Sequence, residues 1–295
     1  NCISITSLNL KNFNTLNVQI INAMFYSCHS LRSLDLSNFN TSSVISMSNL
    51  FANCFSLTTI NLSNFNTSLV TDMSFMFYRC QSLKSLNLSS FNTSIVSDMG
   101  YIFSYCNSLT SLDLSNFDTS SATTMQRMFL DCTSLKSLKI NFTTPKVANF
   151  DSMFYDCISL IYLDLNNFIT SSVNIDFIFY NISDNLIFCI NKENNPNIIS
   201  YLNLNYPNYY NNCSDICFNE IIKIKINENN ECSFDCNNDE TYKFEYKNMC
   251  YESCPNGTHN STSNNFICEE DTINDIIENN ICNNSCNVIN FLNNT

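Results

Sequence analysis

The sequence predicts an α/β repeat fold, a solenoid with short parallel strands on one side and helical turns on the other. A small disulfide-rich region of mostly β or irregular structure follows. Three observations predict this. A cysteine recurs at a fixed period through the first 182 residues, each period contains a strand-like and a helix-like apolar pattern, and closely spaced cysteine pairs fill the rest of the 295-residue chain. A period of about 20 to 50 residues is typical of solenoids and other repeat arrays.

Seven cysteines mark the repeat, the first six spaced 26 residues apart and the seventh following after 25. They are Cys2, Cys28, Cys54, Cys80, Cys106, Cys132 and Cys157. They define about seven coils of 25–26 residues over residues 1–182. One coil cannot bury its apolar face alone, whereas stacked coils bury a continuous core.

Two local patterns share each coil, as the second coil illustrates. Residues 34–36, Leu-Asp-Leu, alternate between apolar and polar side chains, which predicts a strand. Apolar residues from Val44 to Cys54 then recur at the spacing of one helix face. The hydroxyl residues Thr41 and Ser42 stand just before that face, where N-caps are expected. Each coil is therefore predicted to be a strand, a corner and a helical return.

The repeat also resembles a known family. The stretch SLRSLDLSNF, residues 30–39, resembles the leucine-rich repeat core L-x-x-L-x-L-x-x-[N/C]-x-L, although Phe39 replaces the usual Asn or Cys. The unit MFxxCxSLxxLDLSxFxTSxVxxM is similar to the 26-residue repeat of BspA-like surface proteins of bacteria and several unicellular eukaryotes. This resemblance implies a leucine-rich-repeat solenoid on a cell surface that acts as an adhesin or interaction scaffold, without catalysis.

Three interpretations of the cysteine column remain open: buried free thiols, a ladder of disulfides, and a ladder of metal ligands. Disulfides formed only among these seven cysteines would leave one cysteine unpaired. Ile182 stands where the next cysteine would fall, and isoleucine can pack in a core but cannot form a bridge or bind metal. The sequence therefore favours a structural column of buried thiols and no metal.

The chain changes character after the repeat. Residues 183–212 are predicted to be a capping and linker segment, with 186–190 covering the last coil. Residues 213–295 are predicted to be a disulfide-stapled region, because cysteines are dense and apolar residues sparse. The disulfide candidates are Cys189, Cys213, Cys217, Cys232, Cys236, Cys250, Cys254, Cys268, Cys282 and Cys286. Their connectivity cannot be deduced, and zinc binding by the Cys-x-x-x-Cys pairs is the alternative.

Two alternating stretches in this region, residues 222–226 and 242–246, predict short strands that pair in a hairpin. The sequons at Asn256 and Asn260 fall in a polar stretch that we expect to be a loop, which makes them the glycosylation candidates. Together with the cysteines they favour an extracellular or cell-surface location.

Composition argues against several partners. The chain has 13 Lys and Arg against 26 Asp and Glu, a net charge of −13, so nothing attracts nucleic acid or anionic lipid. Its apolar runs are too short to span a bilayer, and a signal peptide or membrane anchor would lie outside this sequence.

No constellation of residues predicts catalysis or a cofactor. The chain has two histidines, His29 and His259, and neither stands at a defensible spacing from a nucleophile and an acid. The two glycines, Gly100 and Gly257, form no phosphate-binding loop. We therefore expect no enzyme activity and no cofactor.

One regular polar feature follows the predicted strands. The residue between the two strand leucines forms a column on the exposed side of the sheet: Asp35, Asn61, Asn87, Asp113, Lys139 and Asp164. A ligand-binding column and an ordinary solvated face predict the same residues, so both interpretations stay open. The column lacks the aromatic and arginine anchors of tight interfaces, which favours weak, multivalent binding of a protein or glycan.

The function predicted first is adhesion or protein or glycan recognition by a non-enzymatic cell-surface or secreted protein. Two alternatives remain. One is a rigid structural spacer of a surface coat without a specific ligand. The other is an intracellular repeat scaffold with a zinc-binding Cys-rich tail.

Overall fold

The computed structural model describes residues 2–170, 173–183, 186–191 and 193–205, and beyond them the strands of the C-terminal region. The chain divides into two compact units, Asn1–Asn212 and Cys213–Thr295, which are described separately.

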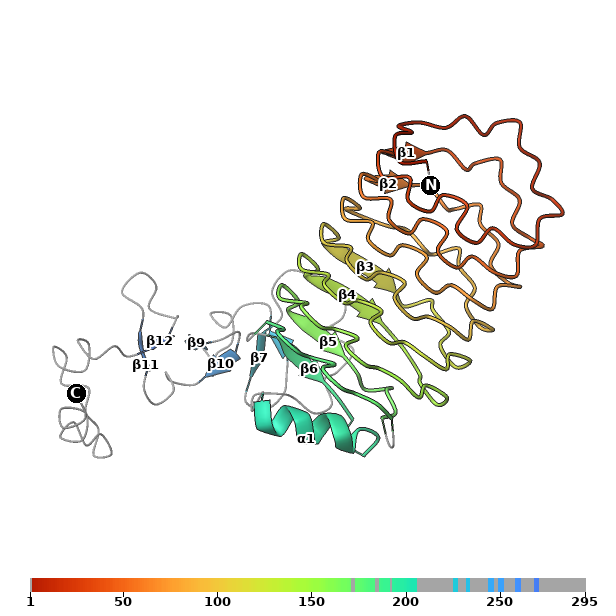
Figure 1. Cartoon of the computed structure of the whole chain (residues 1–295). Coiled ribbons are helices and arrows are strands. Elements are labelled where there is room, and N and C mark those ends of the chain that lie inside the picture. Colours follow the sequence, from red (N-terminus) through yellow and green to blue (C-terminus); the bar gives the residue numbers. More distant parts are fainter. Residues whose placement is uncertain are drawn as a thin grey trace, which may run out of the picture. The chain divides into compact units, whose positions relative to one another are not determined.

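The first unit is a repeat protein whose coils pair through short parallel strands (Figure 1). Its strands are β1 (Ser33–Leu34), β2 (Thr59–Ile60), β3 (Ser111–Leu114), β4 (Ser137–Ile140), β5 (Tyr162–Asp164) and β6 (Ile187–Cys189). The pairs β1–β2, β3–β4 and β5–β6 are each parallel. In β3–β4 the partners Leu112 and Leu138 occupy the same position of successive coils, so the strand side keeps the period of the sequence.

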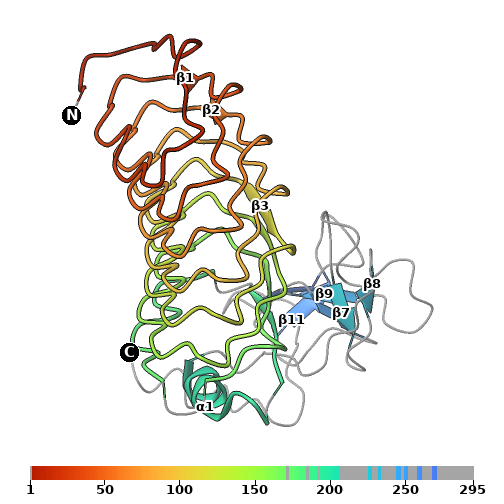
Figure 2. The ribbon, with the colours of Figure 1, turned by 90° about the vertical axis from the view of Figure 1, so that its right-hand side faces the viewer.

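A second line of pairing runs through the part of each coil that follows the strand. Isolated parallel bridges join one residue of each coil to its equivalent in the next: Ile20, Ser46, Asp72, Asp98, Thr124, Asn149 and Asn174. The coils therefore stack in register on both sides of the core, as the side view shows (Figure 2).

The helical return predicted for each coil is wrong. Among the described residues of the repeat there is no helix, and the segment from Val44 to Cys54 consists of successive turns. Its N–H groups alternate between two acceptors: Leu50 donates to Met47 within the coil, and Phe51 donates to the carbonyl of Met76 in the next coil. A helix would direct every N–H inside its own segment, so the sideways bonds between coils replace it.

Two residues of each such segment adopt the left-handed backbone conformation. In the second coil they are Asn49 (φ 57°) and Asn53 (φ 62°), and equivalents occur in all seven coils. The reversal of hand at these residues turns alternate N–H groups outward toward the next coil. We call this face of the first unit the turn side, and the face that carries β1–β6 the strand side.

The core is a set of identical side chains stacked one coil above another. Buried phenylalanines form one column, with ring centroids 5.6 Å apart for Phe25–Phe51, 5.5 Å for Phe51–Phe77 and 5.8 Å for Phe77–Phe103. The column continues through Phe129, Phe154 and Phe179. Leucine, methionine and cysteine columns pack around it. Stacking therefore buries a continuous apolar core that no single coil possesses.

The threonine expected to cap a helix serves another purpose. The hydroxyl of Thr41 donates to the carbonyl of Asn66 in the next coil at 2.9 Å, and Thr67 does the same to Asn92 at 2.8 Å. The N–H of Asn92 donates back to the Thr67 hydroxyl at 2.8 Å. One buried hydroxyl thus satisfies two backbone groups of its neighbour, so this position links coils.

The stack extends beyond residue 182. Ile182 and Leu186 are buried, and β6 adds a further strand beside β5. The segment expected to be a linker contains helix α1 (Pro196–Asn205), whose Ile198 and Leu202 are fully buried in the core. This helix covers the end of the stack, because its apolar side chains replace those of a further coil.

In the second unit, two small sheets are described. One has the order β8 (Cys232–Ser233), β7 (Lys225–Asn227), β10 (Met249–Tyr251), β9 (Phe244–Tyr246), and the other pairs β11 (Thr258–Asn260) with β12 (Cys268–Glu270). The predicted strands exist in part as β7 and β9, but the hairpin between them is wrong because β10 lies between them. Asn260 belongs to β11 rather than to a loop, and Asn256 lies outside the described residues.

Within the part of the chain that the structure describes, no helix has the length and apolar character to cross a membrane.

Candidate functional site

The polar column on the strand side is occupied by local hydrogen bonds. A side-chain oxygen of Asp35 accepts the N–H of Ser37 at 3.0 Å, and Asp113 accepts the N–H of Ser115 at the same distance. Asn61, Asn87 and Asp164 accept equivalent bonds from the residue two positions later. Asp and Asn side chains that bond their own backbone in this way form turns. Five of the six predicted site residues thus shape the corner that follows the strand.

The sixth residue of the column is a cation. Lys139 lies with its Nζ 3.8 Å from Oδ2 of Asp113 in the preceding coil. At Asp113, partial burial tends to raise the carboxyl pKa, but the bonds from Ser115 and the charge of Lys139 outweigh it and lower the pKa. Hydrogen bonds from Ser37 likewise lower the pKa of Asp35. Both carboxylates are therefore ionised and held in place by the fold.

Six of the seven cysteines of the repeat column are buried free thiols, from Cys28 to Cys157. The thiol of Cys54 donates to the carbonyl of Phe25 at 3.2 Å, and Cys106 bonds Phe77 in the same way at 3.3 Å. Burial raises the pKa of Cys54 to about 12. Cys2 departs from the expectation: it is exposed, because no earlier coil covers it in the described structure. The column is a packing feature with little thiolate character.

The disulfide candidates are only partly described. Cys189, at the end of β6, is disulfide-bonded. The backbone of Cys232, Cys250 and Cys268 lies in described strands, while their side chains and the remaining six candidates lie outside the described residues. Among described side chains, no group of three or more His, Cys, Asp or Glu could hold a metal ion.

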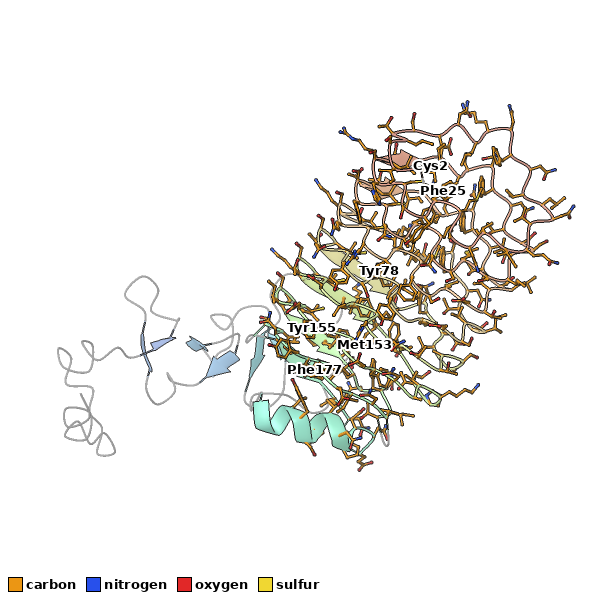
Figure 3. The ribbon with its side chains drawn as sticks, viewed as in Figure 1. Cys2, Phe25, Tyr78, Met153, Tyr155 and Phe177 are labelled. Atoms are coloured by element: carbon orange, nitrogen blue, oxygen red, sulfur yellow. The ribbon has the colours of Figure 1, made fainter. Side chains whose placement is uncertain are left out.

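The turn side carries a surface of a different kind. Aromatic and arginine side chains from five successive coils gather there: Phe75, Tyr78, Arg79, Tyr101, Tyr105, Arg127, Tyr155, Phe177 and Tyr180. We call this set the aromatic surface. Figure 3 labels Tyr78, Tyr155 and Phe177, which come from the third, sixth and seventh coils. None belongs to the buried core, and Phe177 and Tyr180 are 58% and 48% exposed.

Ring contacts join the aromatic surface into two groups, one from Phe75 to Arg127 and one of Tyr155, Phe177 and Tyr180. Phe75 stacks on Tyr101 with ring centroids 4.3 Å apart, and Tyr155 stacks on Tyr180 at 4.7 Å. Tyr78 meets the edge or face of three neighbouring rings. Stacked rings fix each other's orientation, so the surface is preformed.

Two arginines lie on these rings. The guanidinium of Arg79 is 5.2 Å from the Tyr78 centroid and 5.0 Å from that of Tyr105. Arg127 lies 5.6 Å from the Tyr101 centroid and forms an ion pair with Asp151 at 3.1 Å. Each contact is a cation–π interaction.

Several of these side chains occupy strained positions. Phe75, Tyr101 and Phe177 have φ of 57°, 60° and 53°, and Asn49 takes the equivalent place in the second coil. The left-handed conformation costs a non-glycine residue about 1–2 kcal/mol, and Asn tolerates it better than an aromatic residue. The fold therefore needs the conformation at this position but not the aromatic side chain.

Comparison with protein families bears on the repeat. The family described as "Mycoplasma protein of unknown function, DUF285" matches residues 1–111 and 81–186. The chain belongs to the DUF285 family. No curated protein matches the sequence. The match spans the coil stack through Leu186, and the family's description assigns no function.

This DUF285 chain also places two carboxylates beside the aromatic surface. Asp131 and Asp156 occupy the same position of successive coils, and each accepts one hydrogen bond, from Asn107 at 3.0 Å and from Asn181 at 2.6 Å. Burial raises the pKa of Asp131, and the neighbouring charge of Asp156 raises it further. The two carboxylates repel each other without a compensating cation among the described residues.

The aromatic surface was missed from the sequence because the turn segments were interpreted as helices. If the segment were a helix, Tyr101 and Tyr105 would lie next to buried positions, and their sequence positions would not indicate a shared exposed surface. A signal was present: the positions equivalent to Tyr101 hold Ala23, Asn49, Phe75, Arg127 and Ser152, whereas the neighbouring core positions barely vary. Positions that vary among coils while the core stays constant lie outside the apolar core.

Proposed function

We propose that the chain is the leucine-rich-repeat solenoid and Cys-rich region of a BspA-like surface protein, and that it recognises a protein or a glycan without catalysis. The repeat unit, the parallel pairing of the coils and the DUF285 match support a repeat scaffold. Stacked repeats present extended surfaces that suit macromolecular ligands.

The observation that carries the proposal is the aromatic surface. Tyr and Arg are, with Trp, the residues enriched among those that dominate binding energy at interfaces. Here they gather at positions that the core does not require, and four of them, Arg79, Tyr101, Tyr105 and Arg127, have a left-handed backbone that disfavours bulky side chains. Backbone strain kept with bulky side chains is a reason to infer function.

The proposal moves the recognition site away from the strand-side column. The carboxylates and amides of that column already accept backbone hydrogen bonds, so its residue types have a structural explanation. The side chains of the aromatic surface instead contact one another, as in the hydrogen bond from Arg127 to the Tyr101 hydroxyl at 2.9 Å, and no described bond joins their rings to the backbone. We therefore place the recognition site on the turn side.

An extracellular or surface location fits the same proposal. The disulfide at Cys189 supports an oxidising compartment. The remaining cysteines of residues 213–295 and the sequons at Asn256 and Asn260 are typical of secreted glycoproteins.

The test is binding of full-length protein to a printed array of glycans and synthetic peptides. A Tyr101→Ser/Tyr105→Ser variant is compared with an Asn61→Ala/Asn87→Ala variant of the strand side. We expect the turn-side variant to lose about tenfold or more in affinity and the strand-side variant to keep it. Saturable binding that both variants retain, or no binding by the unaltered protein, would reject the proposal; the second result would favour the spacer.

A further inference from the structure

Charged groups of opposite sign stand unpaired on the turn side. Arg79 is exposed and rests on two tyrosine rings, and it forms no ion pair with any described carboxylate. Asp131 and Asp156 accept only amide hydrogen bonds. Arg127, by contrast, forms an ion pair with Asp151. One face of the molecule thus offers both a free cation and free anions.

The order of these groups along the stack matters. Arg79, Tyr105, Asp131 and Asp156 occupy the same position of the third to sixth coils, with φ between 58° and 60°. Since neighbouring coils pair like strands, successive members lie about 4.8 Å apart. The column therefore presents a positive group, a ring and two negative groups in sequence. Turning a second copy around reverses that order and sets opposite charges against each other.

We propose that the aromatic surface binds a second copy of this chain in a two-fold arrangement centred on the fourth coil. Arg79 of each copy then faces Asp131 of the other, and Tyr105 lies beside the axis. The same face is used by both copies, as in the isologous interfaces of most homodimers. This inference rests on the proposed function, because it names the partner of the same surface.

The exposed apolar residues at the two ends of the turn side agree with that symmetry. At the first coil Tyr26 is 36% exposed, and at the seventh coil Phe177 and Tyr180 are 58% and 48% exposed. A two-fold axis through the fourth coil brings the first coil of one copy opposite the seventh of the other. Apolar side chains then meet apolar side chains at both ends, while the opposite charges meet nearer the axis.

The size of the surface sets the strength of the contact. Seven coils at about 4.8 Å give a strip about 30 Å long. To bury the roughly 800 Å² per partner of a standard stable interface, such a strip would have to be about 27 Å wide. The proposed contact uses only the columns of Tyr101 and Tyr105, so we expect a smaller buried area and a dimer that dissociates readily. Because ionic contacts align the copies, association weakens as salt rises.

The experiment is sedimentation equilibrium of the full-length protein at low and high salt. All samples carry Cys2→Ser, which removes intermolecular disulfides at the exposed thiol. We expect a reversible monomer–dimer equilibrium that weakens with salt. Arg79→Glu and Asp131→Arg should each weaken it by about a hundredfold, because each substitution removes two symmetric ionic contacts at about tenfold apiece. The double variant Arg79→Glu/Asp131→Arg should restore it.

Lys139→Glu is the matched control, because it makes the same charge change as Arg79→Glu on the strand side. The dimer association constant of the Lys139→Glu variant should fall far less than that of the Arg79→Glu variant. Circular dichroism and the unfolding midpoint confirm that each variant is folded.

A monomer at every concentration, or a dimer unaffected by either charge reversal, would overturn the inference. Failure of the double variant to restore association would overturn the two-fold pairing. If the protein is monomeric and array binding still depends on Tyr101 and Tyr105, the proposed recognition function stands and only the second copy is rejected.

Discussion

The strand side and the turn side of the coil stack both carry regular columns of polar or aromatic residues. The side chains of the strand-side column form hydrogen bonds that shape the backbone of each coil, whereas those of the aromatic surface contact one another. On the strand side, Asp113 and its equivalents accept backbone N–H groups and end each strand. On the turn side, Tyr101 stacks on Phe75 and Tyr105 meets Tyr78 edge-on, at positions that Asn49 and Asn53 occupy in the second coil. Regular spacing therefore does not separate structural residues from functional ones, whereas hydrogen bonding and backbone strain do.

Two substitutions in the fourth coil separate the buried core from the turn side. Phe103→Ala opens a cavity in the buried phenylalanine column, where the ring is fully buried. We expect a loss of about 3–5 kcal/mol in the free energy of unfolding. Tyr101→Ala, two residues away on the exposed turn side, should cost about 1 kcal/mol or less. Urea unfolding of both variants checks this, and equal losses would mean that the aromatic surface belongs to the core.

The threonine column gives the next largest effect. Thr67→Val keeps the shape of a fully buried side chain but leaves the N–H and C=O of Asn92 without their partner. We expect a loss of about 2–3 kcal/mol in unfolding free energy. Thr71→Val removes an exposed hydroxyl that bonds Ile45 at 3.3 Å and should change it by about 0.5 kcal/mol or less. A Thr67→Val protein as stable as the parent would contradict the linking role.

The cysteine column predicts a pH dependence. Burial raises the pKa of Cys54 to about 12 and the pKa values of Cys80, Cys106, Cys132 and Cys157 well above the ordinary value. Above the unfolded thiol pKa of about 8.5, the unfolded chain releases these protons first, so stability falls as pH rises. Each buried thiol contributes up to about 1.4 kcal/mol per pH unit.

The measurement is urea unfolding between neutral pH and about pH 10. Cys106→Ala should reduce the slope of unfolding free energy against pH by the contribution of one thiol, up to about 1.4 kcal/mol per pH unit. An unfolding free energy that is constant across this range, or an unchanged slope in the variant, would contradict the buried column.

The smallest effect is expected on the strand side. Asp113→Asn keeps the oxygen that accepts from Ser115 and loses only the ion pair with Lys139, and Asn61 already fills this position in another coil. We expect a change within about 0.5 kcal/mol. Asp113→Ala removes the acceptor as well and should cost about 1 kcal/mol. Denaturant unfolding of the pair separates the two contributions, and equal effects of Asn and Ala would show that the hydrogen bond contributes nothing.

Much of the first unit follows from the sequence. The 26-residue spacing predicted the repeat of the coils, and residues 112–114 lie in β3 as predicted. Of residues 34–36 only Leu34 lies in β1, and the equivalent residues 86–88 of the fourth coil form no strand, so the strand prediction holds for part of the coils. The alternation of leucines specifies strands because side chains of a strand point to opposite faces. Burial of Ile182 in the core agrees with its interpretation as a substitute for cysteine.

The turn segments could not be predicted in the same way. Apolar residues at Val44, Met47 and Leu50 fit a helix and fit successive turns, because both bury every third or fourth residue. Only contacts between coils distinguish them, as with the bond from Phe51 to Met76. Helix α1 was missed because its stabilisation comes from covering the last coil through Ile198 and Leu202, a tertiary contact that local sequence does not reveal.

The most direct test is to measure dimerisation and unfolding together in two matched double variants, Tyr101→Ser/Tyr105→Ser on the turn side and Asn61→Ala/Asn87→Ala on the strand side. The turn-side variant should lose dimerisation and the strand-side variant should keep it, while each loses no more than about 1 kcal/mol of unfolding free energy per substitution. Dimerisation kept by the turn-side variant and lost by the strand-side variant, with both folded, would contradict the account.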